Sequence, residues 1–104
     1  MKLYHTSTMT VRKPDTSHSR DYLDFGRGFY LTSILDQAVR YGDRFRRRGK
    51  EAWLNTYELE TDFDKWNVMD ALGLLKYEKP NIQYCIRTER MLDECLTFIE
   101  SRKL

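Results

Sequence analysis

Residues Asp24–Thr32 read Asp-Phe-Gly-Arg-Gly-Phe-Tyr-Leu-Thr, so that two glycines enclose one arginine and an aromatic pair follows. Glycine is favoured where the backbone turns tightly or approaches another group closely, and tyrosine offers a flat face with a polar tip. The pattern therefore predicts a turn that leads into a short strand, Gly28–Leu31, and presents an aromatic ring to a cleft. A helix is expected directly afterwards, from Ile34 to Arg47, with Ser33 as its N-cap.

The rest of the chain alternates between strand and helix patterns. Three further strands are expected, at residues 2–6, 52–59 and 82–87, and a long loop at residues 6–20. Gly49 is expected to end the first helix, and a short helix is expected within residues 62–76. Pro80-Asn81 predicts a turn, and Thr88 is expected to cap a last helix whose apolar spacing continues to Ile99. This order predicts a single mixed α+β domain over residues 1–104.

Composition excludes several classes of protein. The formal net charge of +2 is too small to indicate a nucleic acid or an anionic membrane as partner. The chain contains neither an apolar run long enough to span a bilayer nor the apolar segment of a secretory signal. Cys85 and Cys95 form no CxxC pair, which favours a reducing compartment and predicts a cytoplasmic protein. Together with His18 they lack metal-ligand spacing, so no metal site is expected.

A histidine and two tyrosines occur in a characteristic order. His5 is followed by Thr6 and Ser7, Tyr30 ends the sequence Gly-Arg-Gly-Phe-Tyr, and Tyr41 lies eleven residues further on. This set resembles the histidine–tyrosine branch of the ADP-ribosyltransferases, which includes diphtheria toxin and the poly(ADP-ribose) polymerases. More narrowly, the chain is similar to a bacterial family of small proteins that is assigned to this fold and often found beside toxin–antitoxin genes. The resemblance covers residues 3–60 and 76–99 and implies a small mixed or antiparallel split sheet with flanking helices.

The resemblance also implies a ligand and a reaction. NAD would be the substrate, with His5 on its adenosine-side ribose and Tyr30 and Tyr41 on either face of the nicotinamide ring. The implied binding residues are His5, Thr6, Ser7, Gly28, Phe29, Tyr30 and Tyr41. The implied activity is mono-ADP-ribosyl transfer to a protein or nucleic acid, or hydrolysis of NAD, in a toxin-like role. Candidate partners are the acceptor, an antitoxin protein and a second copy of the chain, and no membrane is expected.

The chain departs from the family pattern at two places. The family usually carries a catalytic glutamate at the start of a late strand, where this chain has Gln83, so the implied catalytic set is His5, Tyr30 and Gln83. A neutral amide donates and accepts hydrogen bonds but does not replace a carboxylate as a base. Glu78 is a weaker substitute, and the segment between Leu59 and Tyr77 is short for the family. The alternative is therefore a degenerate or truncated relative that acts as a protein-binding module.

Some of these residues also have ordinary structural explanations. Tyr41 shares a helical stripe with apolar residues, so packing in the core explains it as well as a ligand does. The basic residues of the segment 40–50 suit the solvated carboxyl end of a helix, and contact with phosphate or RNA is the alternative. The loop that carries Arg12 and Lys13 lies either over the NAD diphosphate or simply at the surface.

Overall fold

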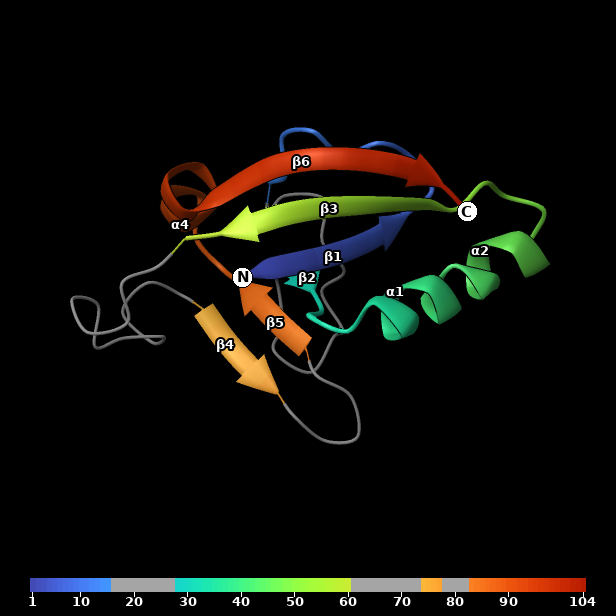
Figure 1. Cartoon of the computed structure of the whole chain (residues 1–104), viewed down its shortest axis with the longest axis horizontal. Helices are drawn as coiled ribbons and strands as arrows, with labels where there is room; N and C mark the ends of the chain where they lie inside the picture. The colour runs from blue at the N-terminus through green and yellow to red at the C-terminus, as the bar shows by residue number, and fades with distance from the viewer. Residues whose placement is uncertain (16–27, 61–73, 78–82) are drawn as a thin grey trace.

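The computed structural model describes residues 1–15, 28–60, 74–77 and 83–104, with the backbone alone described at residues 74–77 and 83. In these residues the chain forms an α+β domain, as predicted. Its strands form two antiparallel sheets, ordered β1-β3-β6 and β2-β5-β4 (Figure 1). The strands are β1 (Lys2–Ser7), β2 (Phe29–Leu31), β3 (Trp53–Leu59), β4 (Leu74–Tyr77), β5 (Gln83–Ile86) and β6 (Leu96–Lys103). The helices are α1 (Leu35–Tyr41), α2 (Asp43–Arg47) and α4 (Glu89–Cys95).

The two sheets meet where β1 passes β2. The backbones of Tyr4 and Thr32 exchange two hydrogen bonds, of 2.8 and 2.9 Å, which form an isolated antiparallel bridge between the sheets. On its other side β1 pairs with β3, so that His5 stands opposite Asn55. The bridge therefore brings β2, which carries Tyr30, alongside the strand that carries His5.

The hydrophobic core lies between the two sheets and α4. The side chains of Phe29 and Leu31 point into it from β2, and Tyr57 is fully buried in β3. The rings of Phe29 and Tyr57 meet edge to face, with centroids 5.7 Å apart. Successive side chains of a strand point to opposite faces of the sheet. Tyr30 lies between Phe29 and Leu31 in β2, so its side chain points away from the core.

The helix predicted from Ile34 to Arg47 is two helices, because the chain turns at Gly42. A Cβ at Gly42 would lie 3.0 Å from Leu104 and 3.2 Å from Ala52, so a larger residue there would require these neighbours to shift slightly. The predicted stop at Gly49 is confirmed. Gly49 has φ of 73° and donates to the Arg46 carbonyl, while Lys50 donates to the Phe45 carbonyl. These two bonds form a Schellman motif.

One of the two predicted N-caps is confirmed. The Thr88 side chain accepts a hydrogen bond from the Met91 amide at 3.3 Å and caps α4. The predicted Ser33 cap is wrong, because Ile34 occupies the N-cap position of α1 and makes no side-chain capping bond. Its own amide donates instead to the Thr32 hydroxyl, at 3.1 Å.

Two expectations for the second half of the chain are wrong. The last helix ends at Cys95, and the residues from Leu96 onward form β6 instead of continuing to Ile99. Pairing with β3 from Leu59↔Leu96 to Trp53↔Lys103 satisfies the backbone there, which overrides the helical spacing of the apolar residues. Residues 74–76, expected at the end of a short helix, belong to β4 and pair with β5.

Other expectations fall outside the described residues. These are residues 24–27 of the glycine turn, residues 62–73 of the short helix, Glu78 and the turn at Pro80-Asn81. In the part of the chain that is described, no helix is long and apolar enough to cross a membrane. The same residues contain no cluster of three or more His, Cys, Asp or Glu side chains that could hold a metal ion.

We expect Gly28→Ala to destabilise the protein by about 1–3 kcal/mol, because the added Cβ would lie 2.4 Å from Cys85 Sγ and 3.1 Å from the Ile86 carbonyl. Chemical denaturation measures the loss, and Cys85→Ala should restore part of it by removing the nearer atom. Gly49→Ala is the matched control, because it is strained by its positive φ in open space and should gain nothing from Cys85→Ala. Equal rescue of both variants would contradict the contact.

Candidate functional site

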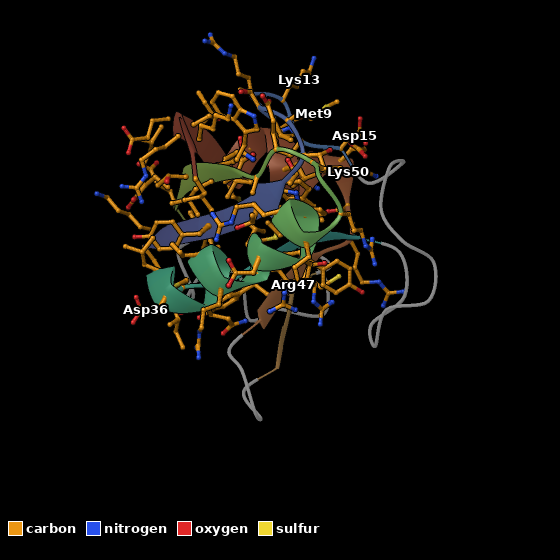
Figure 2. The ribbon with its side chains drawn as sticks, turned by 90° about the vertical axis from the view of Figure 1, so that its right-hand side faces the viewer. Met9, Lys13, Asp15, Asp36, Arg47 and Lys50 are labelled. Atoms are coloured by element: carbon orange, nitrogen blue, oxygen red, sulfur yellow. The ribbon has the colours of Figure 1, made fainter. Side chains whose placement is uncertain are left out.

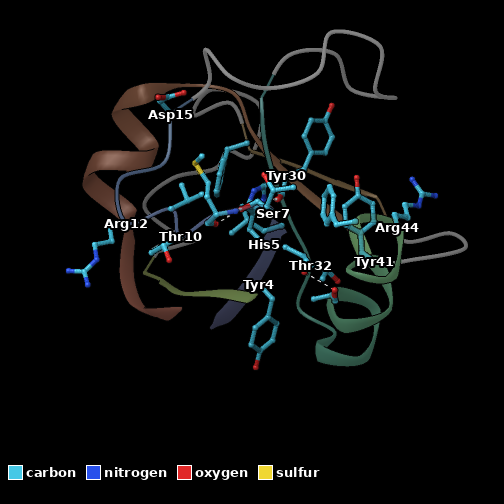
Figure 3. A pocket seen from close by; sticks show the side chains of 18 of the residues that line it. Tyr4, His5, Ser7, Thr10, Arg12, Asp15, Tyr30, Thr32, Tyr41 and Arg44 are labelled. Atoms are coloured by element: carbon cyan, nitrogen blue, oxygen red, sulfur yellow. Dashed lines mark hydrogen bonds between the residues drawn. The ribbon is translucent and has the colours of Figure 1, made fainter. Parts of the chain in front are cut away.

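A cleft of about 920 Å³ opens where β1, β2 and the helices α1 and α2 meet the loop that follows β1 (Figure 3). Its lining comes from residues 4–13 and 15, residues 28–32, and residues of α1 and α2. Pockets that bind cofactor-sized ligands measure roughly 300–1,000 Å³. The cleft is therefore large enough for such a ligand.

His5 lies at the centre of the cleft in a fixed orientation. Its Nδ1 is 2.7 Å from the Tyr30 carbonyl oxygen, and its ring stacks on Phe29 with centroids 4.2 Å apart. A carbonyl only accepts hydrogen bonds, so Nδ1 carries the proton and Nε2 keeps the lone pair. Burial lowers the pKa of His5, and the bond to the Tyr30 carbonyl opposes that shift. This geometry gives a neutral His5 whose Nε2 can accept a hydrogen bond, and no donor to Nε2 lies among the described residues.

Asn55 fixes the wall of the cleft opposite the helices. This side chain is fully buried, and its Nδ2 donates to the His5 carbonyl at 3.1 Å, the Met9 carbonyl at 3.3 Å and the Ser7 hydroxyl at 3.4 Å. Its Oδ1 accepts from the Val11 amide at 2.9 Å. The side-chain amide of Asn55 therefore satisfies backbone hydrogen-bonding groups both in β1 and in the loop that follows it.

Two further contacts hold the same loop. The Ser101 hydroxyl of β6 donates to Asn55 Oδ1 at 2.5 Å, and the Tyr57 hydroxyl donates to the Val11 carbonyl at 2.5 Å. Burial raises the pKa of Tyr57 far above its usual value, so its hydroxyl remains a donor throughout the accessible pH range. The loop wall is thus held by buried groups of β3 and β6.

Both tyrosines of the predicted set line the cleft. Tyr30 reaches it from β2 between Phe29 and Leu31, and Tyr41 reaches it from the end of α1 (Figure 3). Tyr41 is half-buried, meets Phe45 edge to face at 5.7 Å, and has the Arg44 guanidinium 5.0 Å above its ring. Tyr41 therefore contributes to the packing of the helices and to the cleft surface at once.

Thr6 and Ser7, which follow His5, line the cleft and also make hydrogen bonds that stabilise the fold. Thr6 is buried, and its hydroxyl donates to the Ala38 carbonyl at 2.7 Å, which ties β1 to α1. Ser7 donates to the Met9 carbonyl at 2.5 Å and accepts from Asn55. The hydroxyl protons of both residues are thus used within the protein.

The structure also describes Gly28 and Phe29 of the predicted turn and the late strand that begins at Gln83. Gly28 is buried immediately before β2, beside Cys85, and Phe29 faces the core while its ring stacks on His5. Gln83 is the first residue of β5, as expected for the start of a late strand, and β5 pairs with β2 so that Cys85 stands opposite Tyr30. Burial raises the pKa of the Cys85 thiol, against smaller opposing effects from Tyr30 and Arg87.

The cleft carries an excess of positive charge. Arg12, Lys13 and Arg44 line it together with one carboxylate, Asp15. Because His5 is neutral, the charged lining residues sum to +2. An anionic ligand is favoured in a concave site of this sign.

Three polar residues of this region do not belong to the predicted site. Asn55 and Tyr57 hold the loop wall from β3, and Gln37 lines the cleft from α1 with its Oε1 buried and without a hydrogen-bond partner among the described residues. Asparagine is uncommon in strands, so its presence within the strand pattern of residues 52–59 is the sequence signal that could have drawn attention to Asn55.

We expect Asn55→Ala to cost about 3 kcal/mol of unfolding free energy, because it leaves the Val11 amide and two carbonyls without their partner. Hydrogen exchange at the Val11 amide should accelerate more than exchange in the core of β3. Ser101→Ala removes a single bond to the same amide and should cost only about 1 kcal/mol. Equal losses in the two variants would contradict the central role of Asn55.

The lowered pKa of His5 predicts a pH dependence of stability. As pH falls, the unfolded chain takes up the imidazole proton near pH 6.5, while the folded protein resists it until the lower folded pKa. The contribution of His5 is therefore complete above pH 6.5 and is lost as pH falls from there to the folded pKa. NMR titration should give a His5 pKa below 6.5, with His5→Gln identifying the signal; a value above 6.5 would contradict a half-buried imidazole that stays neutral at pH 7.

The comparisons with known proteins concern the part of the chain that contains the cleft. A family model described as Protein of unknown function (DUF3990) matches residues 1–71, which include every residue that lines the cleft. No match was found among curated proteins or solved structures. Since the match covers more than half of the 104 residues, the chain belongs to the DUF3990 family of proteins of unknown function.

Proposed function

We propose that the cleft binds NAD and that the protein is an ADP-ribosyltransferase-like protein. The observation that carries this proposal is that residues from three separate elements meet in one cleft. His5 comes from β1, Tyr30 from β2 and Tyr41 from α1, and the resemblance to the histidine–tyrosine ADP-ribosyltransferases singles out these same three. The split arrangement of the two sheets agrees with the architecture that this resemblance implies.

The chemistry of the lining suits a dinucleotide. The aromatic faces of Tyr30 and Tyr41 would hold the nicotinamide ring, and the Nε2 lone pair of His5 would accept a hydrogen bond from a ribose hydroxyl. The basic residues Arg12, Lys13 and Arg44 complement the charge of a diphosphate. Since Thr6 and Ser7 donate to backbone carbonyls, they would accept hydrogen bonds from the ligand or position its neighbours.

ADP-ribosyl transfer requires the nicotinamide bond to break. The bonding electron pair leaves with nicotinamide, the anomeric carbon of the ribose passes through an oxocarbenium-like state, and the acceptor forms the new bond and loses a proton. Positioning by the cleft would favour the bond cleavage. Gln83, an uncharged amide, would not take up the acceptor's proton, so transfer would depend on an acceptor that is already nucleophilic, or on water for hydrolysis.

Isothermal titration with NAD, followed by assay of released nicotinamide, tests the proposal. We expect wild-type protein to bind NAD and Tyr30→Ala to bind it about tenfold more weakly, since a stacked aromatic ring contributes on the order of 1–3 kcal/mol. Trp53→Ala is the matched control, because Trp53 is a partly buried aromatic residue outside the cleft lining. No heat of binding with wild-type protein, or equal weakening in both variants, would contradict the proposal.

The neutral Gln83 also favours a second candidate function. In this alternative the protein retains the cleft but has lost catalytic activity, and it acts by binding a protein partner. The same titration separates the two functions, because NAD binding without release of nicotinamide supports the second. Gln83→Glu would then be the informative variant, and a gain of NAD cleavage would indicate a site that has lost its carboxylate.

A further inference from the structure

The charge of the chain is concentrated in one short segment. Residues 35–50, which form α1, α2 and the turn after them, contain six Arg or Lys and two Asp, for a local charge of +4. The whole chain has a formal net charge of +2, so the remaining residues sum to −2. The small net charge therefore conceals a strongly basic surface on a slightly acidic protein.

Few of these cations are neutralised within the protein. Arg46 forms an ion pair with Asp43, and Arg40 donates to the Asp36 carbonyl at 3.3 Å. Arg47, Arg48 and Lys50 are exposed and form no ion pair among the described residues. The hydrogen bond from Arg46 lowers the pKa of Asp43, and the charge of Arg47 helps to lower it further. We call Arg47, Arg48 and Lys50 the basic turn.

The backbone of the basic turn is rigidly defined. The Schellman motif at Gly49 fixes the end of α2, and Phe45 anchors this short helix in the protein. Figure 2 looks onto this face of the molecule, with Arg47 and Lys50 projecting from its surface. Three like charges within four residues raise the local positive potential, and a bound anion neutralises part of it.

The basic surface is continuous in sequence with the cleft. Arg44 precedes the basic turn on α2, lines the cleft and lies above the ring of Tyr41. An extended polyanion on the basic turn would therefore lie beside the mouth of the cleft. An isolated small anion would use only one or two of these cations.

We propose that the basic turn binds the phosphate backbone of a nucleic acid beside the cleft. The guanidinium group of arginine donates bidentate hydrogen bonds to phosphate oxygens. Several cations close together in the sequence match the repeated phosphate charges of a polynucleotide. An anionic membrane fits less well, because membrane-bound basic surfaces also carry apolar side chains that insert. The large exposed apolar residues of the described chain are Met1, Met9, Ile34, Leu35 and Ile99. Ile34 and Leu35 lie at the start of α1, and none of the five belongs to α2 or to the basic turn.

Fluorescence anisotropy with labelled single-stranded RNA, single-stranded DNA and duplex DNA of about 20 nucleotides tests this proposal over a salt series. The triple variant Arg47→Ala/Arg48→Ala/Lys50→Ala should weaken binding about tenfold or more and reduce the slope of log K against log salt by about 2 for a single strand. The control Lys2→Ala/Arg90→Ala/Arg102→Ala removes the same charge from other exposed positions and should retain most of the affinity.

The assay contains no NAD, so it succeeds or fails independently of the proposed function. No binding by the wild-type protein to any of the three probes at roughly 50 mM salt would overturn the proposal. Equal weakening by both triple variants would overturn it as well, because net charge alone would then explain the binding. The proposal would also be overturned if the protein bound phosphatidylserine vesicles or polyglutamate more tightly than the nucleic acids, and if the basic-turn triple variant weakened that binding to the same degree. Circular dichroism of both variants confirms that exposed substitutions leave the fold unchanged.

Discussion

The buried amide of Asn55 is the interaction on which the geometry of the cleft depends. Asn55 lies in β3, the central strand of its sheet, and its side chain bonds to the His5 backbone, to the loop after β1 and to Ser101 of β6. His5 in turn donates to the Tyr30 carbonyl of β2. A chain of hydrogen bonds thus runs from the middle of one sheet to the aromatic residue at the edge of the other. Buried polar groups that are fully paired specify one arrangement, because every alternative leaves a partner unsatisfied.

Several elements of the fold could be predicted from local patterns. The strands at β1, β2 and β3, the stop at Gly49 and the cap at Thr88 each depend on a few neighbouring residues. Other elements depend on contacts between residues that are far apart in the sequence. Leu96 and Ile99 fit the apolar spacing of a helix, yet pairing with β3 places them in β6. The single predicted helix is divided at Gly42, where Leu104 and Ala52 pack closely against the chain.

The candidate site shows the same division. The order of His5, Tyr30 and Tyr41 indicated that these residues belong together, and all three line one cleft. The sequence did not indicate that Asn55 and Tyr57 hold the wall of that cleft, because hydrogen bonds across more than forty residues leave no local pattern. The basic residues of the segment 40–50 could be recognised in the sequence, although the small net charge conceals them because acidic residues elsewhere offset their charge.

NMR mapping of amide chemical shifts during titration with NAD tests the central claim most directly, because it reports where a ligand binds as well as whether it binds. The account predicts saturable shifts in the residues around the cleft, namely those of β1, the loop at Met9–Val11, β2 and the end of α1. Residues at the far edge of β6 should be unaffected. Saturable shifts confined to β6 and α4, or none at all, would contradict the assignment of this cleft as a NAD site.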